Sequence, residues 1–458
     1  MTREYHPLVK KYVDWSPVSA KVMERGKQVF PGGDTRASAH FGPYPLVMER
    51  GHGCYLYDVD GHELLDFMNN FTSMIHGHAH PDIVSAIKKQ APLGSAFAAP
   101  SASQIELAEL IISRVPSIEQ MRFCSSGTEG TLMALRCARA VTGRQKIMKM
   151  EGGYHGSYEL AEVSLVPVPD ERGSLHHPNS IPVDKSFPES VLSDTVICPY
   201  NEPELARALI NEHASELAAV IVEPMLGSMG MIPATTEFLQ VLRDETSKND
   251  IVLIFDEVIT LRQSEGGEQQ RHGITPDLTC MGKIIGGGLP VGGFGGNKDL
   301  MNVFNPDAED TVMHASTFSG NALTMATGLA AMAIFGEDES IRINQLGDRL
   351  RQGFNQVLSQ HGIKGQALGS GSLTNILLSS DDIKDSRGTM QAMIDAGHIS
   401  ALVHLGMLRQ GVTSASRLMY CISTPMDESH VDTAITALSD TLTELRPYIE
   451  AERPGLLG

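Results

Sequence analysis

The stretch from Ile251 to Gly296 restricts the fold more than any other part of the chain. It opens with the apolar run IVLIFDEV, whose length and β-branched residues predict a strand buried on both faces of a parallel sheet. Asp256 stands at the carboxyl end of this run, and Lys283 follows among glycines after LTCMG. Because open α/β sheets bind ligands at the carboxyl ends of their strands, both residues are candidate site residues. A lysine among glycines is also typical of an ordinary solvated loop.

A second apolar run, LAAVIVEP, predicts another buried strand that ends at Glu223. A predicted helix around Phe238–Thr246 separates the two strands, and the order strand, helix, strand predicts parallel βαβ units. We therefore expect an α/β fold. Glu223 is either part of a site or a purely structural buried acid.

The segment MRFCSSGTEGTLMALRCARAVTG predicts a short strand, a turn and a helix that ends at Gly143. Ser126, Gly127 and Thr128 lie at the turn. Free N–H groups and the helix dipole at such a position attract phosphate, and the hydroxyl groups add donors. The alternative is an ordinary capped helix, because serine and threonine are preferred at that position in any case.

Four further side chains stand out in predicted loops. Tyr154 follows the strand-like KIMKM on a glycine-rich loop, and Thr317 precedes a helix rich in Ala and Met. Arg36 lies in an irregular segment after PGG, and Arg417 precedes the strand-like RLMYCIST. Tyr154 has an ordinary alternative as a packing residue, and Arg36 and Arg417 have one as surface residues.

The histidines of HGHAHP do not predict a metal site. His76, His78 and His80 share a period of two, but no acid or cysteine completes a ligand set. Six scattered cysteines without a CxxC pair indicate reduced thiols. We therefore expect neither a metal nor a disulfide framework.

The length of 458 residues exceeds that at which single cores usually stop growing. We expect an N-terminal part of a small domain (residues 1–75), a large domain (76–335) and a C-terminal part of the small domain (336–458). Residues 165–200 read as irregular. The net charge of −19 disfavours nucleic acid and anionic membranes as partners. The N-terminus shows no signal segment and the chain no long apolar run, so we expect a cytoplasmic protein.

Six motifs together resemble the class III aminotransferases, the pyridoxal 5'-phosphate (PLP) enzymes of fold type I. They are SSGTEG, GGYHG, VEP, FDEV, DLTCMGKIIGGG and STFSGN, in the family's order and spacing. The resemblance covers nearly the whole chain. It is strongest toward the branch of glutamate-1-semialdehyde aminomutase and the β-amino-acid aminotransferases. It implies a large domain with a mostly parallel seven-stranded sheet flanked by helices, and a smaller α+β domain from both termini.

The resemblance also implies roles for individual residues. Lys283 would be the Schiff-base lysine and proton carrier, and Asp256 would keep the pyridine nitrogen protonated. Arg36 and Arg417 would bind substrate carboxylates. The remaining cofactor contacts would be Ser126, Gly127 and Thr128 at the phosphate, Tyr154 and Val258 on the two ring faces, Glu223 behind the hydroxyl edge, and Thr317 at the phosphate of a neighbouring subunit. The last contact implies a homodimer with shared active sites.

At two places the sequence departs from the family pattern. Leu226 replaces a glutamine common after VEP, which leaves the donor to the cofactor hydroxyl open, with Ser228 a candidate. Thr260, Leu261 and Arg262 replace the common TGF after DEV, where we expect an influence on the substrate entrance.

The preferred interpretation is an aminotransferase with a ping-pong mechanism. It would move an amino group from an amino acid, most simply a β-amino acid, or from an amine to a 2-oxo acid. An aminomutase, or a catalytically silent PLP-binding protein, is the alternative. Against the aminomutase, Arg417 lies in a region where the aminomutase pattern resembles SAFEAGF and carries an acid.

Overall fold

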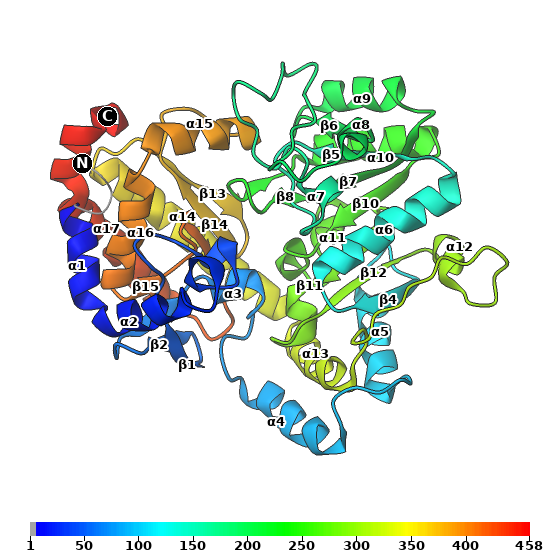
Figure 1. The fold of residues 1–458 in the computed structure, drawn as a ribbon, viewed down its shortest axis with the longest axis horizontal. Coiled ribbons are helices and arrows are strands. Elements are labelled where there is room, and N and C mark those ends of the chain that lie inside the picture. Colours follow the sequence, from blue (N-terminus) through cyan, green and yellow to red (C-terminus); the bar gives the residue numbers. More distant parts are fainter. Residues whose placement is uncertain (1–5) are drawn as a thin grey trace. The chain divides into compact units, whose positions relative to one another are not determined.

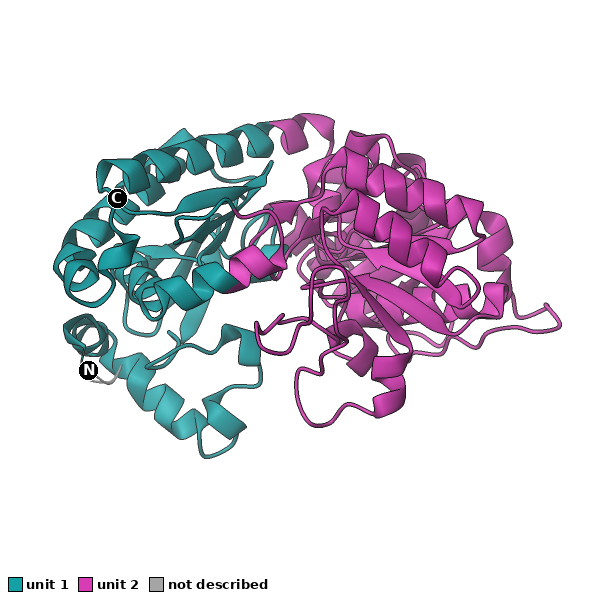
Figure 2. Cartoon of the chain, turned by 90° about the horizontal axis from the view of Figure 1, so that it is seen from above, with its two compact units in different colours: residues 1–80, 342–382, 391–458 teal, residues 81–341, 383–390 magenta. Residues whose placement is uncertain are grey.

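The structure is a computed structural model that describes residues 6–458, and the chain forms two compact units (Figure 1). Unit 1 combines the chain up to His80 with Arg342–Asp382 and Gln391–Gly458. Unit 2 combines Pro81–Ile341 with the short segment Ile383–Met390, as Figure 2 shows in separate colours. The domain limits proposed from the sequence at residues 75 and 335 remain predictions.

Unit 2 is built on a seven-stranded sheet in which a single strand, β12, runs antiparallel to its neighbours (Figure 1). This confirms the mostly parallel seven-stranded sheet. Across the sheet the order is β4 (Gln120–Cys124), β12 (Gly292–Gly296), β11 (Leu278–Gly282), β10 (Val252–Asp256), β7 (Leu217–Val222), β5 (Lys146–Met150) and β6 (Thr195–Cys198).

The central strands are buried along their whole length, as their continuous apolar runs predict. Every residue of β7 and β10 is buried, and Ile254 of β10 is paired with Ile221 of β7. Helix α6 (Gly127–Thr142) crosses these strands with small residues such as Ala134 and Ala138, both fully buried in the same core. Small side chains let the helix approach the sheet closely.

Helices flank the sheet of unit 2. Besides α6 they are α4 (Pro81–Gln90), α5 (Ala102–Arg114), α7 (Glu159–Glu162), α8 (Glu189–Ser193), α9 (Pro203–Glu212), α10 (Thr236–Lys248), α11 (Glu268–His272), α12 (Lys298–Met301) and α13 (Ala322–Ile334). A small hairpin pairs β8 (Met225–Leu226) with β9 (Ile232–Pro233). Helix α10 packs on β7 and β10, and α13 packs on α4 and α5.

Strand β11 was not predicted from its sequence LTCMG, and neither were two further strands of this sheet. Strand β12 has the sequence GGFGG, which was read as part of a glycine-rich loop because glycine disfavours strands. Here glycine is required by close approach: a Cβ on Gly292 would lie 1.8 Å from the Ser126 carbonyl oxygen, and one on Gly296 would lie 2.3 Å from that of Asp277. The other strand, β6, lies inside the segment read as irregular and pairs only with β5 at the sheet edge.

The segment Ile383–Met390 belongs to unit 2 although the chain on both sides of it belongs to unit 1. Arg387 makes a two-pronged ion pair with Glu151, with Nε to Oε2 at 2.7 Å and Nη2 to Oε1 at 2.9 Å. The Thr389 hydroxyl donates to the Met229 carbonyl at 2.9 Å. Since Glu151 is only 1% exposed, this ion pair is shielded from water.

Unit 1 contains two small sheets covered by helices (Figure 1). The strands on either side of Asp60 and Gly61 pair antiparallel and form a hairpin. The four-stranded sheet is β1 (Met48–His52), β2 (Tyr55–Asp58), β3 (Glu63–Asp66) and β15 (Val412–Thr413), and the three-stranded sheet is β13 (Gln366–Ser370), β14 (Leu373–Leu377) and β16 (Met419–Cys421). The helices are α1 (Pro7–Trp15), α2 (Pro17–Gly26), α14 (Glu337–Gln360), α15 (Ser386–Ala396), α16 (Ile399–Arg409) and α17 (Glu428–Glu452), and the short turn Asn69–Thr72 is labelled α3 in Figure 1. Helices α14 and α15 each begin in unit 2.

The six cysteines are free and buried, as expected from their spacing. In residues 6–458, no helix has both the length and the apolar character needed to span a membrane.

Candidate active site

Four neighbouring parallel strands of unit 2 deliver the candidate residues to one edge of the sheet. Asp256 is the last residue of β10, Glu223 follows β7, and Lys283 follows β11. Strand β5 leads into the GGYHG loop that carries Tyr154 and His155. The parallel topology explains why residues far apart in sequence meet here.

Asp256 is buried and held by two donors. Its Oδ1 accepts the backbone N–H of Val258 at 3.1 Å, and His155 Nδ1 lies 2.9 Å from its Oδ2. Burial lowers the pKa of His155 below its ordinary value. The imidazole is therefore neutral at neutral pH and donates its Nδ1 proton to Asp256. This contact fixes the orientation of the carboxylate.

Glu223 is a second buried carboxyl group, 3% exposed. Its Oε1 accepts the N–H of Tyr154 at 2.8 Å and its Oε2 that of Gly227 at 3.2 Å. Burial, and next the Asp256 carboxylate, raise the pKa of Glu223 from 4.5 to about 8, against the opposing effect of these N–H groups and of Lys283. The raised pKa favours the protonated form of Glu223, which can donate a hydrogen bond.

Lys283 occupies a backbone conformation that L-residues rarely adopt. Its φ is +50°, directly after the extended Gly282 and at the start of a 3-10 turn (η6, Lys283–Gly286). Its side chain is half-buried, and its charge acts on Glu223. Left-handed backbone at a non-glycine residue persists only where the surroundings fix it, and it is enriched at functional sites.

The N-terminus of α6 has the features of an anion-binding site. Ser126 caps the helix, with its Oγ accepting the N–H of Glu129 at 3.2 Å. Within the part of the chain that the structure describes, the N–H groups of Gly127 and Thr128 have no acceptor. Val258 packs against this turn: a Cβ on Gly127 would lie 3.1 Å from its Cγ2.

The GGYHG loop is shaped by a buried lysine that the sequence did not single out. Lys149 of β5 is fully buried, and its Nζ donates to the carbonyls of Gly153 at 2.8 Å and Val163 at 2.5 Å. Burial lowers its pKa to about 7. Tyr154 is half-buried on this loop, and its hydroxyl lies 3.0 Å from Ser157 Oγ. The only signal in the sequence was a second lysine inside the strand-like KIMKM.

In unit 1, Arg36 and Arg417 meet at one aromatic ring. The Cζ atoms of Arg36 and Arg417 lie 5.2 Å and 5.7 Å from the ring centroid of Phe71. Arg36 Nη1 also donates to Asn70 Oδ1 at 2.9 Å, and Arg417 Nη2 lies 3.6 Å from Met419 Sδ. The sequence suggested both arginines, but not the ring that joins them.

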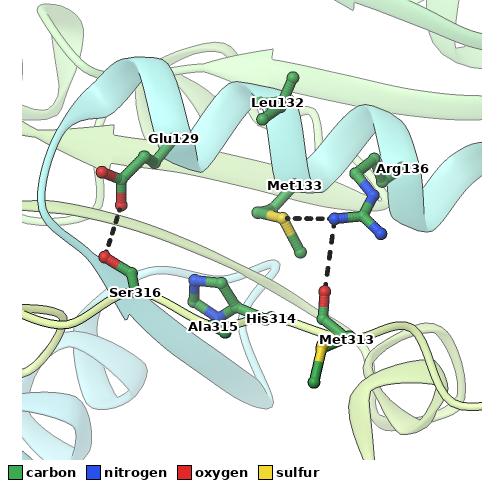
Figure 3. Close-up of a pocket in the computed structure, with 8 residues that line it drawn as sticks. All are labelled: Glu129, Leu132, Met133, Arg136, Met313, His314, Ala315 and Ser316. Carbon is green, nitrogen blue, oxygen red and sulfur yellow. Dashed lines mark hydrogen bonds between the residues drawn. The ribbon is translucent and has the colours of Figure 1, made fainter.

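Thr317 lies in an exposed segment of unit 2 between β12 and α13. Its neighbour Ser316 donates to Glu129 Oε2 in the first turn of α6 at 3.3 Å (Figure 3). The same segment borders a cavity of about 450 Å³ whose wall includes Leu132 and Met313 (Figure 3). Neither Lys283 nor Asp256 lines this cavity, so it is separate from the strand-end site.

The two departures from the family pattern fall in different surroundings. Thr260, Leu261 and Arg262 form part of a 3-10 turn and are all buried, so this stretch is core rather than open surface. Leu226 is fully buried in β8, and Ser228 is half-buried. Among residues 6–458, no group of three or more His, Cys, Asp or Glu side chains forms a potential metal site.

Comparison with known proteins decides the family. Residues 37–442 match the family described as Aminotransferase class-III. The chain belongs to the class III aminotransferases. Their cofactor is PLP, and the fold is that of type I PLP enzymes.

Individual class III relatives differ in their stated reactions. Glutamate-1-semialdehyde 2,1-aminomutase from Desulfotalea psychrophila is 43% identical over 82% of this chain and 86% of its own length. Further curated relatives, 35–38% identical, bear the same name. Among solved structures, an omega-transaminase from Sphaerobacter thermophilus has 43% identity and a TM-score of 0.88 over 93% of this chain and 98% of its own. A β-phenylalanine aminotransferase from Variovorax paradoxus has 33% identity and a TM-score of 0.87 over 96% and 97%.

The residues at the strand ends suit the cofactor of the class III enzymes. The two N–H groups without acceptors at the start of α6 match a phosphate, and the buried Asp256 matches a protonated ring nitrogen. A Cβ at Gly127 would lie 3.1 Å from Val258 Cγ2, so the glycine lets Val258 pack closely against the first turn of α6. The donor set of this chain is therefore complementary to PLP.

Proposed function

We propose that the chain is an aminotransferase that moves an amino group from a carboxylate-bearing amino acid, most simply a β-amino acid, to a 2-oxo acid in two half-reactions. The observation that carries the proposal is the pair of arginines on the Phe71 ring. Donor and acceptor both bear a carboxylate, and guanidinium groups bind carboxylates through two parallel N–H groups. The similarity to a β-phenylalanine aminotransferase supports the β-amino acid as donor.

Residues of unit 2 would hold the cofactor. Lys283 would bind its aldehyde, and Asp256, oriented by His155, its ring nitrogen. Bound PLP supplies an electron sink for the substrate carbon that loses a proton. The Lys283 amine would carry that proton from the substrate carbon to the cofactor's aldehyde carbon. The other contacts would be Ser126, Gly127 and Thr128 at the phosphate, Tyr154 and Val258 on the ring faces, and Glu223 at the hydroxyl edge.

An aminomutase is the second candidate, and the curated relatives favour it, because all of those named above are glutamate-1-semialdehyde 2,1-aminomutases. Such an enzyme moves the amine within one molecule and needs no second substrate. The two reactions therefore differ in whether a 2-oxo acid must be added.

The deciding assay supplies β-phenylalanine and 2-oxoglutarate or pyruvate, together and separately, and glutamate 1-semialdehyde alone. An aminotransferase converts β-phenylalanine continuously only when the oxo acid is present. Sustained turnover of glutamate 1-semialdehyde alone, without any oxo-acid-dependent reaction, would establish the aminomutase instead. No reaction with any amine would identify a silent PLP-binding protein.

The arginine variants Arg36→Ala and Arg417→Ala test the carboxylate contacts within that assay. Each is expected to raise the KM of the substrate whose carboxylate it binds by about 10- to 150-fold, the usual value of hydrogen bonds to charged groups. Separate half-reaction kinetics assign donor and acceptor. The control is Arg50→Ala, since Arg50 also stacks on a ring of unit 1, that of Tyr57, at 3.4 Å. Unchanged KM values in both half-reactions would refute the carboxylate role.

The same proposal includes a homodimer in which Thr317 reaches the phosphate bound by the other subunit. Large apolar side chains flank Thr317: Met313 is 76% exposed and Phe318 62% exposed, as expected for a surface that another chain covers.

A mixing experiment tests this arrangement. Lys283→Ala subunits and Thr317→Ala subunits are each impaired alone. A mixed dimer contains one site with an intact lysine and an intact threonine from the opposite chain. Co-refolding the two variants is therefore expected to restore activity at one site per mixed dimer. A monomer in sedimentation, or no recovery in confirmed mixed dimers, would contradict it.

A further inference from the structure

The segment Asn69–Thr72 in unit 1 has an unusual backbone. Four consecutive residues without a glycine among them have positive φ, of 47°, 47°, 55° and 73°. Asparagine tolerates this left-handed region, whereas phenylalanine and threonine adopt it rarely. A run of this kind persists only where the surrounding structure fixes it, and such runs concentrate at functional sites.

Buried contacts hold both ends of this left-handed turn. Asp66 Oδ1 accepts the N–H groups of Met68 and Asn69, both at 2.9 Å. His78 Nε2 lies 2.8 Å from the other carboxylate oxygen of Asp66. Asn69 is fully buried, and its Nδ2 donates to the carbonyl of Cys421 at 2.9 Å. The turn is thereby tied to β3 on one side and β16 on the other.

The exposed side of the left-handed turn carries the contacts to the arginines. Phe71 presents its ring to Arg36 and Arg417, and Asn70 accepts a hydrogen bond from Arg36. The attraction between a guanidinium and a ring face uses the ring quadrupole and none of the N–H groups. Within residues 6–458, Arg36 has no carboxylate partner. A ring shared by both cations can therefore orient them without occupying the donors that a carboxylate needs.

We propose that the left-handed turn Asn69–Thr72 is a positioning element for substrate carboxylates, in which Phe71 orients both Arg36 and Arg417 and Asn70 orients Arg36. This inference rests on the proposed function only in that the two arginines bind carboxylates. It makes Phe71 a positioning residue that acts on both half-reactions through the arginines.

The test compares Phe71→Leu with Phe71→Tyr. Neither new side chain is branched at Cβ, so both meet the same backbone cost at φ +55°, but only tyrosine keeps an aromatic face. Phe71→Leu is expected to raise the KM of β-phenylalanine and of the oxo acid roughly 3- to 30-fold, with little change in kcat, and Phe71→Tyr to stay near wild type. The matched substrate is 1-phenylethylamine, which is β-phenylalanine without its carboxylate. Its KM is expected to stay unchanged.

A binding measurement without turnover supports the kinetics. Glutarate carries carboxylates but no amine or carbonyl, so calorimetric titration of the PLP-loaded enzyme reports carboxylate binding alone. Its Kd should rise by the same factor in Phe71→Leu. If that variant does not fold, Asn70→Gly takes its place: glycine accepts positive φ, and the side-chain contacts to Arg36 and to Ser73 Oγ are lost. Asn70→Gly is then expected to weaken only the carboxylate that Arg36 binds.

The outcomes separate this inference from the proposed function. If Arg36→Ala and Arg417→Ala weaken carboxylate binding while neither turn variant does, the positioning role is wrong and the function stands. If Phe71→Leu impairs 1-phenylethylamine as much as β-phenylalanine, Phe71 serves only the general structure. If the arginine variants themselves leave carboxylate binding unchanged, the proposal that the arginines bind carboxylates is wrong, and the positioning role of the turn is wrong with it.

Discussion

Replacement of Lys283 by alanine is expected to abolish amino-group transfer while leaving the fold intact. The substitution removes the Lys283 amine, which would both bind the cofactor and carry the proton. General acid–base catalysis alone is usually worth about 10²- to 10⁴-fold, so activity should fall at least by that factor. Steady-state rates of both half-reactions measure the loss, and circular dichroism with thermal melting checks the fold.

Two further variants make the Lys283 result specific. Lys283→Arg keeps the positive charge near Glu223, but a guanidinium stays protonated, so this variant should be as inactive as the alanine variant. Lys298→Ala removes an exposed lysine of the same unit and should behave as wild type. Normal turnover in Lys283→Ala would show that another residue anchors the cofactor.

Asp256→Asn is expected to slow the proton-removal step by about 2–4 kcal/mol, roughly 30- to 1000-fold, because a neutral amide cannot stabilise a protonated ring nitrogen. The shape is conserved, and His155 Nδ1 can still donate to the amide oxygen. Stopped-flow measurement of the first half-reaction isolates this step.

Glu257→Gln provides the matched control for Asp256. Glu257 is the adjacent acid and is also fully buried, but its carboxylate accepts the N–H groups of Glu268 and Gln269 at 3.0 Å and 2.9 Å. Its replacement should lower the thermal stability without slowing the chemical step. Equal stopped-flow rates for Asp256→Asn and wild type would exclude Asp256 as the partner of the ring nitrogen.

The sequence predicted those parts of the fold that depend on continuous apolar runs. Strands β7 and β10 are buried throughout, so their composition is decisive, and the positions of Glu223 and Asp256 at their ends follow from the parallel topology. Strand β12 was missed because its glycines are required by close neighbouring backbone, that of Ser126 at Gly292 and of Asp277 at Gly296, and not by strand propensity. Its position depends on a tertiary contact that no local window contains.

Site residues that directly follow a predicted strand could be identified from the sequence. Contacts between segments far apart in the sequence could not. The folded GGYHG loop brings the His155 imidazole to Asp256 and the Gly153 carbonyl to the buried Lys149 amine. Phe71 gains its importance only because Arg36 and Arg417, from opposite ends of the chain, reach the same ring. The sequence NNFT does not predict a left-handed turn, apart from the fact that asparagine tolerates positive φ.

The short segment Ile383–Met390 has a consequence for protein engineering. The chain passes between the units after His80, Ile341, Asp382 and Met390, so neither unit is a continuous piece of the gene. A fragment that stops at Ile341 would lack Arg387 and leave Glu151 as a buried charge without its counter-ion, a loss that typically costs about 3–5 kcal/mol. When whole units are exchanged between relatives, the eight residues Ile383–Met390 must therefore be transferred together with the rest of unit 2. Otherwise Glu151 must be replaced at the same time.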